Sequence, residues 1–293
     1  MNFEETLEKY SSIVEEALEH HLPPSNAYPP LIHQAMRYSV MGGGKRLRPV
    51  MVIAVAEAVG GKAADVMPAA CALEMIHAYS LIHDDLPAMD NDDYRRGKPA
   101  NHKVYGDAVA ILAGDALLTL AFSMLANVRA QNTDDVVKVI DEIALAAGTF
   151  GMIGGQVVDT FSAGEDINER TLEYIHSHKT GALYRAAVRA GAILAGAEEE
   201  KLNSLTCYAD NLGLAFQIID DILDVEGDAA KIGKPVGSDV KNKKVTYPSL
   251  FGMEEARAKA RQAAGRALSA LDCFGEEADF LKMLVHYIID RDY

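Results

Sequence analysis

The sequence predicts an all-α protein, a helical bundle in one domain that spans residues 1–293. Ala, Leu, Ile and Met recur at helical spacing along most of the chain, and β-branched runs with two-residue alternation are nearly absent. The Gly-, Pro-, Asn- and Asp-rich stretches between these segments are short, and none resembles a low-complexity linker. A chain of 293 residues is long enough to bury a sizeable core.

The apolar periodicity predicts each helix in turn. In the N-terminal half the expected helices are Asn2–His20, Pro30–Met41, Pro49–Val59, Val66–Asp85 and Gly106–Val128. In the C-terminal half they are Asp134–Phe150, Glu169–Leu194, Glu198–Val225, Met253–Leu271 and Glu277–Asp290. The breaks coincide with clusters of turn-forming residues at Leu22–Pro30, Gly42–Gly44, Gly60–Gly61, Pro87–Pro99, Ser162–Asn168 and Gly227–Asn242.

The composition limits the possible partners and compartment. A net charge of −15 disfavours nucleic acid and anionic lipid as general partners. The three cysteines are widely spaced and odd in number, as expected of reduced thiols rather than a disulfide framework. The N-terminus is charged, and no uninterrupted apolar run approaches a bilayer span. We therefore expect a cytoplasmic protein with no stable membrane insertion.

Two acidic clusters lie near the ends of apolar helices. Asp84 and Asp85 end one helix, and Pro87 disfavours its continuation, so the chain should bend and bring Asp90 back towards Asp84. The second cluster, Asp220-Asp221-Ile222-Leu223-Asp224, lies late in another helix, where Asp220 and Asp224 share one face.

Carboxylates near a helix C-terminus are electrostatically unfavourable unless a cation accompanies them. Mg²⁺ prefers oxygen ligands, commonly one or two carboxylates with water and substrate phosphate. Two facing clusters could thus hold several Mg²⁺ ions around a diphosphate. The alternative is that each cluster is a solvated acidic helix end, although the apolar flanks of both clusters argue for buried carboxylates that need a partner.

Basic residues near these clusters could bind an anion. Gly42–Gly44 precedes Lys45 and Arg48, and glycines allow close approach of the backbone to an anion that the two side chains could hold. A flexible basic turn is the alternative. Arg95 and Arg96 follow the first cluster, where simple charge balance would also explain them. His77 precedes Asp84 by two helical turns, where a hydrogen-bonded core histidine is the ordinary interpretation.

Taken in order, these motifs resemble those of the trans-polyprenyl diphosphate synthase family, and most closely the bacterial farnesyl diphosphate synthases. The resemblance covers nearly the whole chain from about Gly42 onwards. It is carried by Gly43–Pro49, Asp84–Asp90, Gln156–Asp159, Lys179-Thr180-Gly181, Phe216-Gln217 with Asp220–Asp224, Gly233-Lys234-Pro235 and Lys244–Pro248.

The resemblance implies a fold and a reaction. The family fold is a helical bundle around one deep central cavity, usually in a homodimer. The implied enzyme joins isopentenyl diphosphate to dimethylallyl or geranyl diphosphate by ionisation, condensation and proton loss. The expected product is farnesyl diphosphate, with geranylgeranyl diphosphate as the alternative. Three Mg²⁺ ions per active site are implied, and Mn²⁺ could replace them.

The resemblance also implies a role for each matched residue. The metal ligands would be Asp84, Asp90 and Asp220, supported through water or indirect contacts by Asp85, Asp221 and Asp224. The allylic diphosphate would contact Arg95, Lys179 and Lys234. Isopentenyl diphosphate would be held by Lys45, Arg48, His77 and Arg96. Oxygens facing the carbocation would come from Thr180 and Gln217, and the same site would include Gln156, Asp159 and Lys244.

Product length should depend on the residues just before the first aspartate cluster. Tyr79 and Ser80 precede Asp84 by five and four residues, so Tyr79 should lie roughly 7.5 Å deeper along the helix. That distance is about one isoprene unit, so the Tyr79 ring could stop elongation at fifteen carbons. The alternative is that Tyr79 is ordinary core and length is set elsewhere.

Three other functions compete with this one. A non-catalytic subunit of a heteromeric prenyl synthase would share the fold but usually lacks motif residues, which are present here. A terpene cyclase or a head-to-head condensing enzyme would not need Lys45, Arg48 and Arg96 for a second diphosphate. A Mg²⁺-dependent phosphohydrolase would need a water-activating base, and none is apparent. Arg291-Asp292-Tyr293 could either cover the site or fray.

Overall fold

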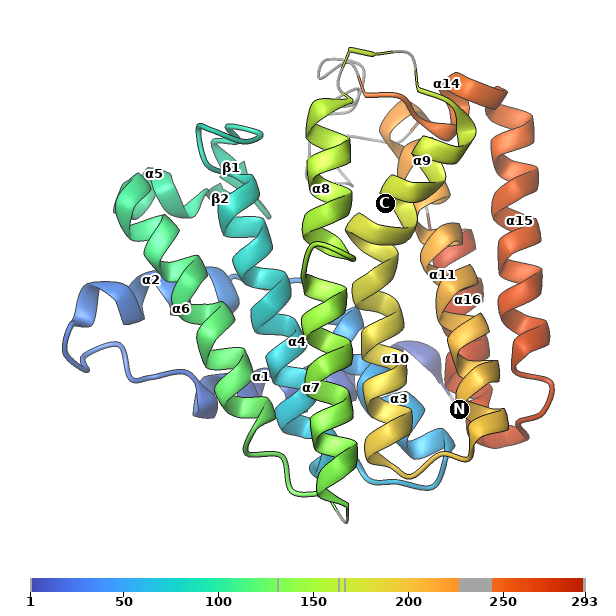
Figure 1. Ribbon diagram of the computed structural model, residues 1–293, viewed down its shortest axis with the longest axis horizontal. Coiled ribbons are helices and arrows are strands. Elements are labelled where there is room, and N and C mark those ends of the chain that lie inside the picture. Colours follow the sequence, from blue (N-terminus) through green and yellow to red (C-terminus); the bar gives the residue numbers. More distant parts are fainter. Residues whose placement is uncertain (1, 131, 163, 166, 227–243, 292–293) are drawn as a thin grey trace.

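Helices make up nearly all of the regular structure, which confirms the predicted all-α class (Figure 1). The computed structural model describes residues 2–130, 132–162, 164–165, 167–226 and 244–291. The strands in this part of the chain are β1 (Tyr94–Arg95) and β2 (Lys98–Pro99), which form a small antiparallel hairpin with Tyr94 opposite Pro99.

The helices of the N-terminal half are α1 (Phe3–His21), α2 (Pro30–Val40), α3 (Leu47–Ala58), α4 (Ala63–Asp84), α5 (Asn101–Tyr105) and α6 (Asp107–Leu125). Those of the C-terminal half are α7 (Thr133–Ala147), α8 (Met152–Phe161), α9 (Glu169–Ile175), α10 (Ala182–Leu194), α11 (Glu199–Glu226), α14 (Tyr247–Phe251), α15 (Met253–Ala270) and α16 (Asp279–Asp290). A π-helix, η1 (His176–Gly181), joins α9 to α10, and a 3₁₀ turn, η2 (Glu276–Ala278), precedes α16.

The core forms around α3, α4 and α10. These helices are apolar on most sides, as expected of helices surrounded by others, and most of their residues are buried. Gly191 allows α10 to cross α3 closely, because a Cβ at that position would lie only 2.3 Å from the Val52 carbonyl oxygen. The outer helices α1, α7 and α15 each bury one stripe and expose a charged side.

The observed helices differ from the predicted ones in the middle of the chain. Residues 152–161, which were not assigned to a predicted helix, form α8, and the segment expected as one helix over Glu169–Leu194 contains the π-helix η1. Gly154 and Gly155 weaken the helical pattern of α8 in the sequence. In the structure they permit close packing, since a Cβ at Gly155 would lie 2.2 Å from the backbone nitrogen of Lys179.

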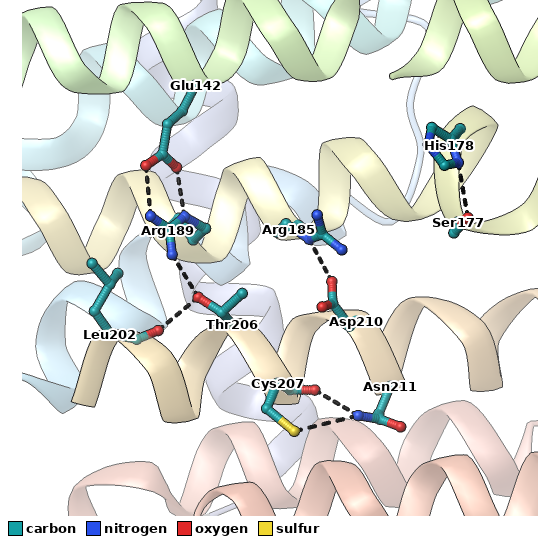
Figure 2. Close-up of polar contacts among 10 residues, drawn as sticks. All are labelled: Glu142, Ser177, His178, Arg185, Arg189, Leu202, Thr206, Cys207, Asp210 and Asn211. Atoms are coloured by element: carbon teal, nitrogen blue, oxygen red, sulfur yellow. Dashed lines mark hydrogen bonds and ion pairs between the residues drawn. The ribbon is translucent and has the colours of Figure 1, made fainter. Parts of the chain in front are cut away.

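A polar network on the outside of the bundle ties three helices together (Figure 2). Arg189 of α10 donates to both carboxylate oxygens of Glu142 on α7, over 2.6 and 2.7 Å. It also donates to Thr206 Oγ1 on α11 over 2.7 Å, and Thr206 in turn donates to the Leu202 carbonyl. A bidentate guanidinium–carboxylate pair fixes both partners in orientation, so Arg189 aligns α7 and α11 against α10.

Helix α6 is apolar on a side that no other described part of the chain covers. It is long and apolar enough to span a membrane by length and composition alone, although Asp115 interrupts it, and 39% of its most apolar window is buried. One side of α6 packs along α4. On its outer side Ile111 and Leu112 are 44% and 57% exposed.

Candidate active site

The first aspartate cluster folds back on itself as its sequence predicts. Helix α4 ends at Asp84, and the backbone N–H of Asp90 donates to the Asp84 carbonyl over 2.9 Å. Asn91 adopts a left-handed conformation, with φ of 53°, and its N–H donates to the Leu86 carbonyl. Burial, and then the negative charge of Asp90, raise the pKa of Asp84 to about 6, although Lys179 opposes the rise. An ionised Asp84 therefore needs further positive charge.

Asp85 has a different environment from its neighbour. It is buried and forms an ion pair with the guanidinium of Arg95. Arg95 Nε donates to Asp85 Oδ1 over 3.0 Å and to Oδ2 over 3.3 Å, and Nη2 pairs with Oδ1. Arg95 also lies 3.5 Å from Asp92. Asp85 thus holds Arg95, one of the residues expected to contact the allylic diphosphate, at the end of α4.

The second aspartate cluster shows the same division. Asp221 is buried, accepts the backbone N–H of Tyr247 over 2.9 Å, and lies 3.7 Å from the imidazole of His176. The His176 ring stacks on the Tyr247 ring at 5.3 Å. Asp221 therefore links α11 to α14 and η1; its predicted indirect support of a metal ion stays a prediction. Asp220 and Asp224 are more accessible than Asp221.

The π-helix η1 lies between the two clusters. The Thr180 hydroxyl donates to Gln217 Oε1 over 3.0 Å, and Gln217 Nε2 is 3.5 Å from Asp220 Oδ2. Lys179, the preceding residue, acts electrostatically on Asp84 of the other cluster. Both α4 and α11 run towards the same end of the bundle, where the hairpin and α9 also lie (Figure 1). The structure thus places both clusters at the same end of the bundle, with Lys179 and Thr180 between them.

Two lysines converge on Asp159 of α8. Lys179 Nζ lies 2.6 Å and Lys244 Nζ 3.3 Å from Asp159 Oδ2. Burial alone would raise the pKa of Asp159, but the two ammonium groups reverse that effect and hold it below its ordinary value. Both polar atoms of the Gln156 side chain, one helical turn earlier, are buried without a partner among the described residues. Gln156 thus has hydrogen-bonding capacity to offer a ligand.

The basic loop, residues 42–48, lies against α4 and the β1–β2 hairpin. Burial first, and then the surrounding arginines, hold the pKa of His77 well below its usual value, so it is neutral at pH 7. The Arg48 guanidinium lies 4.9 Å over the Tyr184 ring, and its Nε has no partner among the described residues. Lys45 lies 5.6 Å over the Tyr287 ring. Arg96 approaches Gly44 so closely that a Cβ there would lie 2.5 Å from Arg96 Cζ.

Comparison with known proteins identifies the family. The profile described as polyprenyl synthetase matches residues 29–284. The chain belongs to the polyprenyl synthetase family. It is 48% identical over 283 residues to a geranylgeranyl diphosphate synthase of Cyanophora paradoxa, covering 96% of this chain and 93% of that protein. It is 46% identical over 290 residues to a farnesyl diphosphate synthase of Geobacillus stearothermophilus, covering 97% of each chain.

A solved structure supports the same assignment. The fold superposes on the apo structure of an FPP/GFPP synthase from Zymomonas mobilis with a TM-score of 0.88, at 36% identity, covering 98% of this chain and 99% of that one. The predicted family and fold class are therefore confirmed. Prenyl transfer is confirmed at the level of the family, whereas relatives with different products resemble this chain about equally.

The two clusters offer carboxylate oxygens, which are the donor type that Mg²⁺ prefers. Among the described residues, no group of three or more His, Cys, Asp or Glu side chains is close enough to form a complete metal site. Mg²⁺ commonly uses one or two carboxylates and completes its shell with water and phosphate. Asp84 with Asp90, and Asp220 with Asp224, are the carboxylates that would hold it.

The remaining predicted residues lie as follows. Tyr79 and Ser80 are on α4, where Tyr79 is buried and its hydroxyl has no partner among the described residues. The Ser80 hydroxyl donates back to the His77 carbonyl over 2.9 Å. Lys234 lies outside the described residues. A cavity of about 40 Å³ lies beside Asp85 and Arg95, between α2, α4 and the hairpin; the predicted deep central cavity remains a prediction.

The C-terminal arginine docks on the second cluster. Arg291 pairs with Asp220 Oδ1, donates to the Phe216 carbonyl over 3.0 Å, and lies 4.0 Å over the Phe216 ring. The sequence left open whether this tail covers the site or frays; Arg291 contacts the second cluster, and residues 292–293 lie outside the described residues. Sequence reasoning missed a second feature, a buried ion pair of Arg46 and Glu74 beneath the basic loop. A signal existed, because Glu74 is an isolated acid in a long apolar segment.

Proposed function

We propose that this chain condenses isopentenyl diphosphate with dimethylallyl diphosphate, and then with geranyl diphosphate, to give farnesyl diphosphate. The observation that carries the proposal is the bridge between the two aspartate clusters: Lys179 acts on Asp84, and Thr180 next to it contacts Asp220 through Gln217. A diphosphate bound between the clusters would meet carboxylate-bound cations on two sides and an ammonium group on a third.

The chain's own cations would stabilise the leaving diphosphate. Cleavage of an allylic C–O bond leaves negative charge on that group, and preorganised positive charge in a partly desolvated site lowers the barrier most effectively. Arg95 is oriented by Asp85, and Lys179 by Asp159, so both charges are fixed in place before the reaction. When bound at the aspartate clusters, Mg²⁺ would supply additional Lewis-acid charge to the diphosphate.

The second substrate would be held by the basic loop. Lys45, Arg48 and Arg96 carry positive charge in addition to that of Arg95 and Lys179, which the allylic diphosphate would contact, and neutral His77 can donate or accept a hydrogen bond at the same place. Holding the isopentenyl double bond close to the allylic carbon converts condensation into an effectively unimolecular step. The oxygens of Thr180 and Gln217, hydrogen-bonded to each other, would face the carbocation.

Farnesyl diphosphate is proposed as the product because of Tyr79. A buried aromatic ring on α4, one helical turn or more beneath Asp84, would limit the length of a growing chain. Geranylgeranyl diphosphate is the second candidate, because the similarity to a geranylgeranyl diphosphate synthase is as high as that to a farnesyl diphosphate synthase.

The proposal is tested by incubating the purified chain with labelled isopentenyl diphosphate, Mg²⁺ and each allylic primer in turn, and sizing the products. Fifteen-carbon product from dimethylallyl and geranyl primers is the expected result. A twenty-carbon product would favour the second candidate. No product from any primer would mean a non-catalytic subunit and would refute the assignment.

We also propose that the chain forms a homodimer through α6 and α7, which are in contact with each other. Leu112 on α6, and Val137 and Leu145 on α7, are between 49% and 60% exposed, and a group of exposed apolar side chains on neighbouring helices can mark an interface. A second copy of the same surface would cover them, since isologous two-fold contacts are the commonest form of oligomer.

A further inference from the structure

Beneath the basic loop, two oppositely charged side chains are buried together. Arg46 Nη1 lies 2.6 Å from Glu74 Oε1, and the two side chains are only 1% and 3% exposed. Arg46 Nη2 donates to the Val40 carbonyl over 2.7 Å. Neither residue has a place in the chemistry described above. Burying two charges is costly unless their geometry is well satisfied, so the pair calls for an explanation beyond stability.

The pair holds the loop in an unfavourable backbone conformation. Arg46 has φ of 50°, in the left-handed region that non-glycine residues rarely adopt. It is also the residue that precedes α3, and its carbonyl accepts the N–H of Val50. The conformation of Arg46 therefore decides how Lys45 and Arg48, on either side of it, are presented. Strain of this kind persists only where surrounding contacts enforce it.

The same loop is interlocked with Arg96. Arg96 is also left-handed, with φ of 53°, and its guanidinium packs on Gly44, where a Cβ would lie 2.5 Å away from Arg96 Cζ. Any shift of the loop would therefore displace Arg96.

Electrostatics connects the same groups. Burial, Arg46, Arg95 and Arg48 all lower the pKa of Arg96, and Glu74 acts against them. Four arginines also act on His77. Glu74 thus offsets part of the mutual repulsion among these arginines.

We propose that Glu74 is a positioning residue for the isopentenyl diphosphate site, acting through Arg46 to fix residues 42–48 so that Lys45, Arg48 and Arg96 converge before the substrate binds. This inference rests on the proposed function. Glu74 itself would not touch the substrate.

Two opposing effects decide the outcome of removing the Glu74 charge. If the geometry were unchanged, losing a negative charge would tighten the binding of an anion. After this change Arg46 would still have Glu15, a half-exposed side chain whose Oε1 lies 3.6 Å from Arg46 Nε. That contact is longer and more solvated than the pair with Glu74, and a buried guanidinium that has lost its close ion pair is strongly unfavourable. We therefore expect the loop to move to hydrate Arg46, and Lys45 and Arg96 to move with it. We expect the loss of geometry to dominate.

The test is Glu74→Gln, which keeps size and shape but removes the charge. The expected result is a KM for isopentenyl diphosphate raised at least about tenfold, with the KM for geranyl diphosphate changed less than about twofold. Calorimetric titration of isopentenyl diphosphate alone should show the same loss of affinity. Equal changes in both KM values, or an unchanged or lower KM for isopentenyl diphosphate, would overturn the proposal.

A double variant separates the route through Arg46 from a direct effect on Arg96. Arg46→Met removes the side chain through which Glu74 would act, so adding Glu74→Gln to it should change the KM for isopentenyl diphosphate by less than about a further twofold. A further rise as large as that caused by Glu74→Gln in the wild-type background would contradict the proposed route and indicate a direct effect on Arg96.

Glu142→Gln is the matched control, because it breaks another Glu–Arg pair, that with Arg189, on the outside of the bundle (Figure 2). It should lower Tm and leave both KM values unchanged. A selective rise in the KM for isopentenyl diphosphate in this control would also overturn the proposal. If the wild-type chain neither turns over nor binds isopentenyl diphosphate, the proposed function fails together with this inference; if it does both, only the inference is at risk.

Discussion

At the scale of single residues, Asp84 and Asp85 are adjacent but differ in what surrounds them. Burial raises the pKa of both carboxyls, to about 6 for Asp84, but Asp85 is paired with Arg95, which opposes the rise, whereas Asp84 has the negative charge of Asp90 beside it. A carboxyl whose folded pKa lies above its unfolded value destabilises the fold when it is ionised. That destabilisation is fully present above about pH 6, shrinks as the pH falls through the folded pKa, and is gone below about pH 4, where the group becomes protonated in both states.

Asp84→Asn should therefore stabilise the metal-free protein while it removes activity. With chelator present at pH 7 we expect a gain on the order of 1–2 kcal/mol, allowing for partial exposure, and a turnover at least about a hundredfold lower. Thermal melts at pH 7 and pH 4.5, together with product assays, check both effects. The gain should shrink at the lower pH, and near-wild-type turnover would refute the ligand role.

Asp85→Asn provides the contrast at the neighbouring position. It leaves the Arg95 guanidinium without its charged partner, so we expect it to lower the stability at pH 7, by about 2 kcal/mol. If Asp85→Asn stabilised the fold as much as Asp84→Asn, the distinct roles assigned to the two residues would be wrong.

Tyr79→Ala should shift the product from fifteen towards twenty carbons. Removing the ring opens space next to the growing chain, at a cost in stability of about 3 kcal/mol. Chromatography of the dephosphorylated products measures the change. Tyr208→Leu is the control, because it removes another buried ring, whose hydroxyl donates to the Leu281 carbonyl. It should destabilise the protein without altering product length. An unchanged product in Tyr79→Ala would mean that length is set elsewhere.

At the scale of elements, the π-helix η1 determines how the lysine and threonine of the site are presented. Its wider turn interrupts the path from α9 to α10 at His176–Gly181, and such turns are often found at functional sites. Gly155 of α8 packs directly on the backbone of Lys179. The position of Lys179 therefore depends on a close approach between two elements that only glycine permits.

Gly155→Ala should accordingly reduce turnover, although Ala is the better helix former. The new methyl group would push η1 away from α8 and shift Lys179, and a displacement near 1 Å costs up to about a hundredfold in rate. Gly265→Ala in α15, where a Cβ would meet nothing within 4 Å, is the control. It should raise stability by about 0.5–1 kcal/mol and leave kcat unchanged. Wild-type turnover in Gly155→Ala would show that η1 tolerates the shift.

At the scale of the whole molecule, the uncovered apolar side of α6 and α7 bears on assembly. Leu112→Glu should disrupt a dimer formed there, because it places a charge in what would be a dry interface. Light scattering after size-exclusion chromatography gives the mass directly. Tyr28→Ser changes an apolar residue that is 93% exposed on the loop before α2 and should leave the mass as in the wild type. A wild-type chain that elutes as a monomer would contradict the proposal.

Sequence reasoning succeeded where chemistry depends on local spacing. Residues near one another in the chain determine the helical periodicity and the bend that brings Asp90 to Asp84. They also form the motifs by which the family is identified. It failed where packing decided the local structure. The glycines of α8 look like helix breakers, and no local signal distinguishes the π-turn at His176–Gly181 from ordinary helix.

The sequence by itself therefore determined the all-α class, the family and the two acidic clusters, because periodicity and motif order are local properties. Only the tertiary structure decided which aspartate of each pair anchors a neighbouring element, and that Arg291 and Asp220 meet. The same holds for Arg46 and Glu74, which are 28 residues apart in the chain. Such partnerships depend on which helices lie side by side, and burial then fixes how strongly each charge needs its partner.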